Sequence, residues 1–433
     1  MKIITKLFFV SSLAKVISIL AKIIIARKIP TQAMSIYSLT LPTLSLLLNI
    51  CQLGIPTTIS KLIAKKTYPI FKIMQNGIFI LLLIDLIFGV LYIFSVPYIA
   101  NLYLKNPLTL PTLYGMVLLL PLISLTSLLK GYFIGIGKIE KTNFCQISEE
   151  ITRLLFIIIF IDIFDNSNLS LMSFLAMFSS IIGEIASLLH LLLLTFNKSK
   201  NILKRVQKDN ENNIVIIKKI STLSIMNTST KLIGSFIYFL EPIIFTSLMI
   251  KANVDHEQIT LNYGIVTSYF LPLILLPNFF SNAISMYMFP KLSSLIENKK
   301  FTEAKNIFIN SSLLCLLIGF IFIMLIFLFP NFFTNILYGK EIGINYIKKY
   351  SLFFILYFLQ MPFHMSLIAF DKEKKLLIES IICNILRIFC FFILIPSYKT
   401  DGMIISIIIS IYVSLLIEVY EIYKSFLIVK YKN

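Results

Sequence analysis

Apolar stretches long enough to cross a lipid bilayer follow one another along nearly the whole chain. Of its 433 residues, 58% are hydrophobic and only 14% are charged, and no stretch longer than a loop has the composition of a soluble domain. A helical crossing needs about 20 apolar residues, so these residues supply about a dozen crossings and little else. The sequence therefore predicts an all-α polytopic membrane protein of about twelve transmembrane helices, with no catalytic domain outside the membrane.

Polar clusters and Pro/Gly punctuation divide the chain into two sets of predicted spans. The first six lie at residues 3–26, 34–60, 77–100, 108–134, 144–164 and 169–196. The next six lie at residues 214–240, 259–288, 307–329, 346–370, 376–396 and 403–429. The longest polar loop separates the two sets. We therefore expect an N-terminal lobe at residues 1–200, a cytoplasmic linker at 201–213 and a C-terminal lobe at 214–433.

The distribution of positive charge predicts the orientation in the membrane. If the N-terminus is cytoplasmic, most of the 39 Lys and Arg residues fall in inside loops and few in the opposite loops. Cytoplasmic loops of membrane proteins carry this excess, so both termini are expected on the cytoplasmic side of a cytoplasmic membrane. The net charge of +18 then reports topology, and nucleic acid is not an expected partner.

The two halves repeat each other in register. Leu41-Pro42 and Leu271-Pro272 lie 230 positions apart, and further on the offset becomes 234, which pairs Lys138 with Lys372 and Arg153 with Arg387. A run of such matches indicates duplication. Because each copy has an even number of crossings, the sequence predicts two pseudo-symmetric six-helix lobes with the same topology.

Lysines inside the predicted spans are the first candidates for a binding site. An ionisable group at the centre of a membrane helix costs at least ~2.5 kcal/mol unless it has a partner or a water-filled cavity. Lys15 and Lys22 lie seven positions apart in the first span and therefore share one helical face. The seventh span carries Asn227 and Lys231 four positions apart, which also places them on one helical face. We expect both lobes to present a basic polar face to a wet cavity.

Side-chain amides on neighbouring spans form the second group of candidates. Asn49 and Gln52 lie in the second span, and Asn278 and Asn282 lie in the eighth. Such amides suit sugar hydroxyls in a cavity. The alternative is that they hydrogen-bond neighbouring helices, as polar side chains commonly do in membrane bundles.

Acidic residues and arginines inside the spans have less specific roles. Asp85 and Glu184 are candidates for cation or proton coupling, although structural neutralisation is the favoured interpretation. Glu241, next to Pro242, is either a gate residue or a helix end. Arg153 and its repeat counterpart Arg387 are intramembrane arginines, and the spacing of Glu149 and Glu150 before Arg153 permits ion pairs within one helix.

Catalytic and metal-binding motifs are missing from the sequence. The three histidines, His190, His256 and His364, are widely separated, and the five cysteines follow neither a disulfide framework nor a metal-ligand spacing. No Gly-rich phosphate-binding loop is present, and GYFIGIG at residues 131–137 is expected to be a close-packed helix end. We therefore expect no enzymatic activity, no cofactor and no metal site.

Several motifs resemble one family in order and spacing. They are the run ARKIPTQAMSIYSLTLPTLSLLLNICQLGIPTTISKLIAKK at 26–66, PLISLTSLLKGYFIGIGKIEKTNFCQISEEITRL at 121–154, and the later FLEPIIF, YGIVTSYFLPLILLP and FPKLSSLIENKK. These runs resemble the stage V sporulation protein B group of the multidrug, oligosaccharidyl-lipid and polysaccharide (MOP) exporter superfamily. The resemblance implies two six-helix lobes around a central cavity, lined in part by the first-helix lysines Lys15 and Lys22.

The same resemblance implies a flippase that moves a lipid-linked glycan by alternating access. The expected substrate is an undecaprenyl-pyrophosphate oligosaccharide or peptidoglycan precursor for the cell wall or spore cortex. Expected partners are that substrate, membrane lipids and cell-wall synthesis enzymes, with the chain itself monomeric. Three alternatives stay open, namely a cation-coupled multidrug exporter, a non-transporting scaffold for cell-wall enzymes and a membrane glycosyltransferase.

Overall fold

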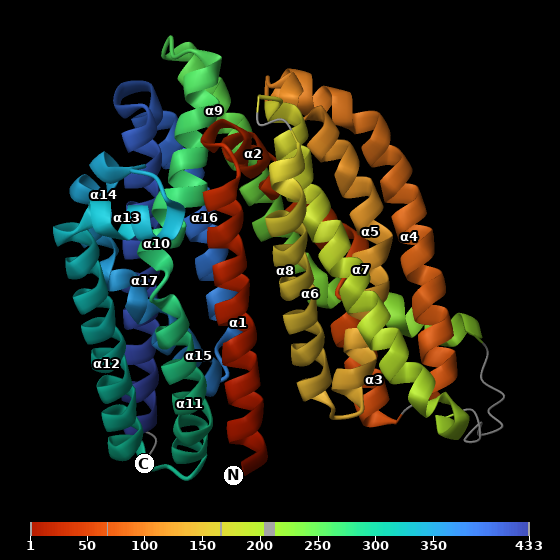
Figure 1. Ribbon diagram of the computed structural model, residues 1–433. Coiled ribbons are helices and arrows are strands. Elements are labelled where there is room, and N and C mark those ends of the chain that lie inside the picture. The colour runs from red at the N-terminus through yellow and green to blue at the C-terminus, as the bar shows by residue number, and fades with distance from the viewer. Residues whose placement is uncertain (1, 67, 165–166, 203–212, 432–433) are drawn as a thin grey trace. The chain divides into compact units, whose positions relative to one another are not determined.

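The membrane-spanning passes are all helical. The computed structural model describes residues 2–66, 68–164, 167–202 and 213–431. Within these residues no strand is present, which confirms the predicted all-α class. In the described part of the chain, ten helices are long and apolar enough to cross a membrane. Helices α1 (Lys2–Lys28) and α6 (Ile139–Phe160) are long helices in two further predicted spans, which is consistent with twelve passes (Figure 1).

The helix boundaries follow the predicted spans closely. The other helices of the first half are α2 (Thr31–Gln52), α3 (Ile55–Lys65), α4 (Ile70–Tyr98), α5 (Leu110–Gly135), α7 (Leu169–Ile202) and α8 (Asn213–Lys251). The second half contains α9 (His256–Gly264), α10 (Leu271–Leu275), α11 (Asn278–Glu297), α12 (Phe301–Leu328), α13 (Pro330–Tyr338), α14 (Ile344–Tyr350), α15 (Gln360–Ala369), α16 (Glu373–Tyr398) and α17 (Thr400–Tyr431).

Several passes are interrupted by local breaks in the helix. The second pass breaks between α2 and α3, where Leu53 and Gly54 adopt positive φ angles of 41° and 58°. Glycine tolerates this conformation, and Pro56 then fits the first turn of α3, where its missing N–H is not needed. The tenth pass consists of α14, a 3₁₀ segment at Ser351–Leu359 and α15. Each predicted span is therefore present, but not always as one straight helix.

The chain divides into two compact units, Met1–Ile243 and Ile244–Asn433. The first unit includes most of α8, because Ile216 and Ile220 pack into one cluster with Ile55 and Ile59 of α3. The predicted lobes at 1–200 and 214–433 remain a prediction. Residues 203–212 of the predicted linker lie outside the described part of the chain.

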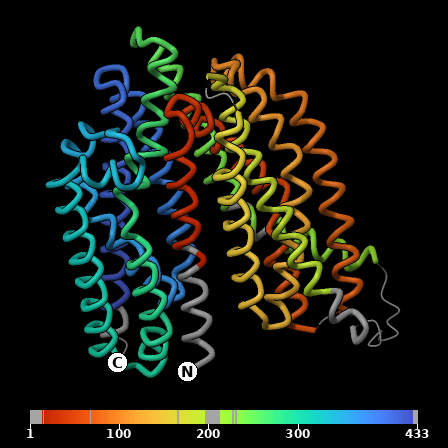
Figure 2. Tube along the Cα trace, viewed as in Figure 1, coloured from red at the N-terminus to blue at the C-terminus, as the bar shows by residue number. Residues whose placement is uncertain are grey.

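The two units use the same scheme of helix packing. In the first unit α5 contacts α3, α4 and α7, and α7 also contacts α6. In the second unit α15 contacts α11, α12 and α17, and α17 also contacts α16. Figure 2 shows α11 and α12 running side by side as a hairpin, as α3 and α4 follow each other in the first unit. The packing therefore supports the internal repeat.

Close contact between α5 and α3 explains the Gly-rich motif. A Cβ atom on Gly131 would lie 2.6 Å from the Pro56 carbonyl oxygen, and one on Gly135 would lie 2.8 Å from Cβ of Ile63. Only glycine allows the two backbones to approach this closely. The predicted close-packed helix end is therefore confirmed.

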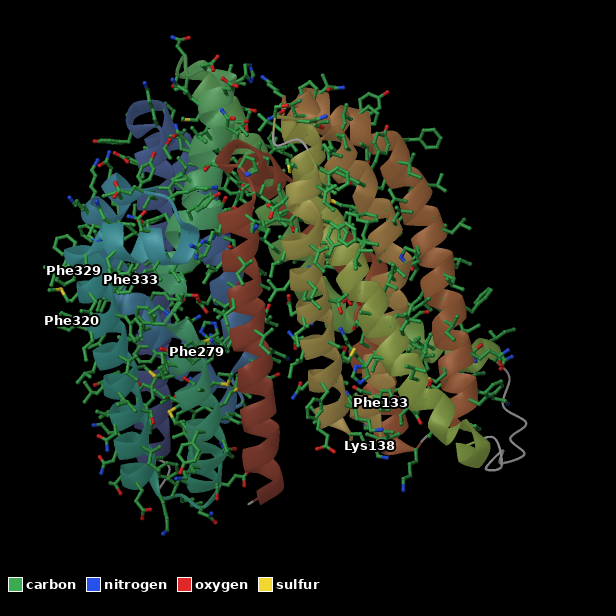
Figure 3. All side chains as sticks on the ribbon, viewed as in Figure 1. Phe133, Lys138, Phe279, Phe320, Phe329 and Phe333 are labelled. Carbon is green, nitrogen blue, oxygen red and sulfur yellow. The ribbon has the colours of Figure 1, made fainter. Side chains whose placement is uncertain are left out.

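Large apolar side chains cover the outer faces of the long helices. On α12 the side chain of Phe320 is 48% exposed, and Phe329, which follows the helix, is 58% exposed. Figure 3 shows both phenylalanines at the outer edge of the ribbon, together with Phe333. Exposed apolar coverage on this scale is expected where helices face lipid tails.

Candidate functional site

The basic faces predicted on α1 and α8 are uncovered where the structure describes them. Helix α1 packs against α6, and its buried residues include Ala14 and Ala21. Lys22 is exposed on α1, and Lys231 is exposed on α8. Neither lysine belongs to any of the ion pairs within the described residues. The side chains of Lys15 and Asn227 lie outside the described residues, although their backbones belong to these helices.

The amide candidates fold partly onto their own helices. The Asn49 amide donates to the Ser45 carbonyl oxygen at 3.0 Å, and the Asn282 amide donates to the Asn278 carbonyl oxygen at 2.9 Å. The Asn278 amide lies 3.4 Å from the Tyr357 hydroxyl, a weak contact between neighbouring helices. Gln52 is half-buried in the last turn of α2. The side-chain oxygen of Asn278 is buried. The assignment of the four amides to a sugar-binding cavity remains a prediction.

A charged network lies between α5, α6 and α7 in the first unit. The Lys130 ammonium lies 3.4 Å from Glu149, and the Arg153 guanidinium lies 3.6 Å from Glu149 and 3.1 Å from Glu150. One helix away, the Thr126 hydroxyl donates to the carboxylate of Glu184, which is 5% exposed. Paired charges of this kind avoid the large cost of an isolated charge in an apolar lobe. Arg153 and the two glutamates therefore neutralise one another's charge within this network.

Asp85 and Glu241, the other coupling or gate candidates, are both buried. Asp85 on α4 is 8% exposed, and its Oδ1 accepts a hydrogen bond of 3.0 Å from the Ser124 hydroxyl of α5. Glu241 on α8 is 4% exposed and lies next to Pro242 inside the helix, so it does not mark a helix end. A role in coupling or gating stays a prediction for both residues.

A second cluster lies between α15, α16 and α17, with two buried carboxylates and a His364 side chain that is 36% exposed. The Nδ1 atom of His364 lies 2.6 Å from Oε1 of Glu418, and the Ser414 hydroxyl donates to Oε1 of Glu379 at 2.5 Å. Arg387, the repeat counterpart of Arg153, instead donates to the Asn384 side chain at 2.9 Å. The sequence analysis did not single out Glu379 or Glu418. The offset of 234 could have found Glu418, because it aligns Glu184 with Glu418 and Lys130 with His364, but it aligns Glu379 with Cys145 and gave no signal for that residue.

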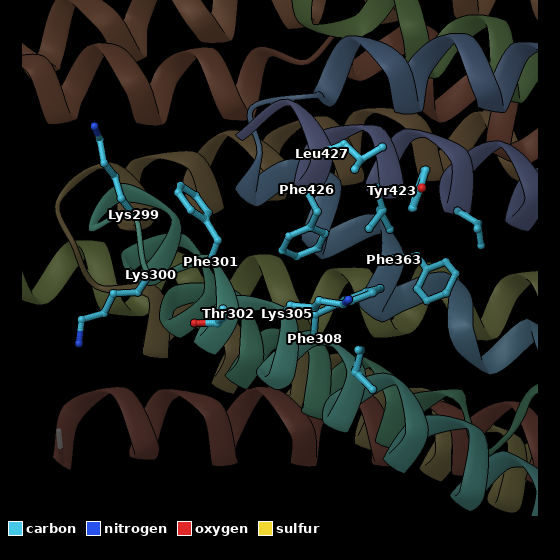
Figure 4. Close-up of a pocket in the computed structure, with 13 residues that line it drawn as sticks. Lys299, Lys300, Phe301, Thr302, Lys305, Phe308, Phe363, Tyr423, Phe426 and Leu427 are labelled. Carbon is cyan, nitrogen blue, oxygen red and sulfur yellow. The ribbon is translucent and has the colours of Figure 1, made fainter. Parts of the chain in front are cut away.

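A pocket of about 670 Å³ opens at the N-terminal end of α12. Its wall is largely aromatic and aliphatic, and Figure 4 shows Phe308, Phe363 and Phe426 on it, with Lys305 reaching toward Phe363. Lys299 and Lys300 contribute from the loop before α12. The charge distribution predicts that this end is cytoplasmic. The lining suits an amphiphile with an apolar chain and an anionic head group.

Solved structures with a similar fold are transporters. The inward-facing conformation of a multidrug resistance MATE family transporter of the MOP superfamily matches with a TM-score of 0.70, with 16% identity, covering 96% of this chain and 94% of that one. A MOP superfamily transporter from Pyrococcus furiosus, described as having a binding pocket of reverse polarity, matches with a TM-score of 0.58, with 15% identity, covering 98% of this chain and 94% of that one. The fold is therefore that of the MOP superfamily transporters.

Sequence comparison gives the family within this fold. The family described as polysaccharide biosynthesis protein matches residues 2–296, and the chain belongs to it. The chain is similar to stage V sporulation protein B of Bacillus subtilis (strain 168), with 28% identity over 395 residues, covering 89% of this chain and 76% of that protein. It is also similar to sporulation protein YkvU of the same organism, with 20% identity over 382 residues, covering 88% of this chain and 85% of that protein.

Proposed function

We propose that the protein is a flippase that moves an undecaprenyl-pyrophosphate-linked oligosaccharide or peptidoglycan precursor across the cytoplasmic membrane. The observation that carries the proposal is that Lys22 and Lys231, on helices of a transporter fold, are exposed and form no ion pair with any side chain that the structure describes. A lysine inside a membrane span without a protein partner needs a polar ligand or water. A pyrophosphate supplies the opposite charge, and Lys15 on the face of Lys22 would add to it.

Membership of the polysaccharide biosynthesis family supports a glycan as the cargo. The side-chain carbonyl oxygens of Asn49, Gln52 and Asn282 are suitable acceptors for sugar hydroxyls, whereas that of Asn278 is buried and would have to become exposed first. The pocket beside Phe308 and Phe363 supports a lipid-linked form of the cargo, because an apolar wall beside lysines fits a polyprenyl chain next to a phosphate. Alternating access then moves the head group while the chain stays in the bilayer.

The inside-negative membrane potential contributes to this transport. Moving one elementary charge across it is worth about 2.3 kcal/mol per 100 mV. Expelling an anionic pyrophosphate from the cytoplasm is therefore favoured. Asp85, Glu184 and Glu241 would be the groups available for an additional coupling ion.

The test is flipping by the full-length protein reconstituted in liposomes with fluorescent undecaprenyl-pyrophosphate sugars. We expect dithionite to quench the outward-moved label in wild-type vesicles, and Lys22→Gln combined with Lys231→Gln to slow this at least tenfold. Lys218→Gln is the matched control. Lys218 is exposed in the second turn of α8, 13 residues before Lys231, and should keep wild-type flipping.

The result also separates the proposal from its rivals. If the variant with both Lys22→Gln and Lys231→Gln flips the sugar lipid at the wild-type rate, the two lysines take no part in transport. Extrusion of a lipophilic cation in place of the sugar lipid would favour a multidrug exporter. A protein that moves neither molecule, yet is retained with cell-wall synthesis enzymes in pull-down experiments, would favour a scaffold.

A further inference from the structure

Three groups of the second unit are close enough to hold one ion. They are the imidazole of His364 on α15, the carboxylate of Glu379 on α16 and the carboxylate of Glu418 on α17. One ligand atom from each lies within 4.8 Å of the other two. Residues 364, 379 and 418 meet only because three helices pack together, so their spacing in the sequence gave no indication of a metal site.

Buried carboxylate oxygens of the cluster accept no hydrogen bond from any residue that the structure describes. The side chain of Glu418 is 0% exposed, and neither of its oxygens accepts a hydrogen bond of good geometry, although Oε1 lies near His364. Glu379 is 4% exposed, and its Oε2 also lacks a hydrogen-bond partner. Buried carboxylate oxygens are rarely left in this state, because desolvation is not compensated. The geometry therefore calls for a positively charged ligand.

At the equivalent position of the first unit, a lysine ammonium supplies the positive charge that the ligand would supply in the second unit. The offset of 234 aligns His364 with Lys130 and Glu418 with Glu184. In the first unit the cation is part of the chain, since the Lys130 ammonium lies 3.4 Å from Glu149. In the second unit the ammonium is replaced by an imidazole, which is charged only when protonated. The second unit therefore has two carboxylates without the built-in cation.

Nearby charges already have partners of their own. Lys372 and Lys375 lie 3.1 and 3.4 Å from Glu421, one turn further along α17 from Glu418. Arg387 donates to Asn384. The thiol of Cys383 lies 3.9 Å from Oε1 of Glu379 and is a neutral neighbour of the cluster.

We propose that His364, Glu379 and Glu418 bind one divalent transition-metal ion of the Zn²⁺ type. Zinc binds imidazole nitrogen and carboxylate oxygen at about 2.0–2.2 Å, so its ligands lie no more than about 4 Å apart and the cluster needs only a small contraction. A divalent charge neutralises the two carboxylates. An imidazole ligand favours Zn²⁺, Co²⁺ or Ni²⁺ over Mg²⁺, Ca²⁺ or Na⁺.

The test measures metal binding by the full-length protein in lipid nanodiscs, without any transport assay. The protein is stripped with EDTA, dialysed against Zn²⁺ or Co²⁺, and its metal content and Co²⁺ absorption spectrum are measured. We expect one ion per chain and no displacement by excess Mg²⁺ or Na⁺. Glu379→Gln with Glu418→Gln should weaken binding at least ~10-fold, the scale seen when metal-site partners are removed.

Two further variants make the result decisive. His364→Lys restores the ammonium found in the first unit, so it should fold without metal, melt at a higher temperature than the stripped wild type and bind no Zn²⁺. Glu421→Gln, the matched control on α17, should bind Zn²⁺ like the wild type. The proposal fails if the stripped wild type takes up no ion, if Na⁺ or Mg²⁺ competes equally, or if His364→Lys binds Zn²⁺ unchanged.

Discussion

Replacing Gly131 with alanine tests whether the contact between α5 and α3 holds the first unit together. The added Cβ would lie 2.6 Å from the Pro56 carbonyl oxygen and 3.0 Å from its Cα, and both atoms are backbone atoms that cannot rotate away. Ordinary contact begins near 3.4 Å, so α5 and α3 must separate by several tenths of an ångström. Overpacking of this kind costs about 1–3 kcal/mol.

Gly89 on α4 supplies the matched control, because a Cβ there meets nothing within 4 Å. Both substitutions change the helix propensity by the same residue exchange, which favours alanine by about 1 kcal/mol in a helix interior. The difference between the two variants therefore isolates the packing cost. We expect Gly131→Ala to be less stable than Gly89→Ala by about 1–3 kcal/mol.

The assay is reversible unfolding of purified protein in mixed micelles with increasing sodium dodecyl sulfate, followed by circular dichroism. A midpoint for Gly131→Ala clearly below that of Gly89→Ala supports the close contact. Equal midpoints, or a more stable Gly131→Ala, would refute the reasoning and place α5 further from α3.

The other predictions concern the charged groups. Lys130→Met should lower the free energy of unfolding by about 1–3 kcal/mol in the same assay, less than for a fully buried pair, because Lys130 is 28% exposed and Arg153 still contacts Glu149. Lys28→Met should lower the free energy of unfolding by less than about 1 kcal/mol, because the side chains of Lys28 and its partner Asp162 are 37% and 62% exposed. A larger loss of stability would contradict this account. Thr126→Val should destabilise the protein by about 1–3 kcal/mol, because it removes a hydrogen bond to a buried carboxylate.

The sequence predicted the fold in most of its particulars. Alternating runs of apolar residues and loops with Lys gave spans that match the helices, since a bilayer crossing leaves a strong signal in composition. The breaks were not predicted. The one at Leu53 depends on a left-handed backbone that the pattern of hydrophobicity does not report.

The candidate site was predicted less completely. Lys22 and Lys231 were found because a charge in an apolar run is conspicuous, and the structure shows both exposed. Glu379 was missed because it lies in the second turn of α16 close to lysines, and Glu418 was missed although it lies inside the predicted span 403–429, because only tertiary packing brings the two carboxylates against His364. Contacts between residues far apart in sequence are the part of a site that local patterns cannot supply.

The length of α4 has a consequence for the lipid environment. The helix contains 29 residues, which at 1.5 Å per residue amounts to about 43 Å, whereas the hydrocarbon core of a typical bilayer is only about 30 Å thick. Exposed apolar side chains follow α4 from Ile78 to Phe94, which is 72% exposed, and Leu102 just beyond the helix is 63% exposed, so the apolar coat is longer than the hydrocarbon core is thick. A long helix can span a thicker bilayer by tilting less from the membrane normal. The protein should therefore remain inserted when its host lengthens its fatty acyl chains.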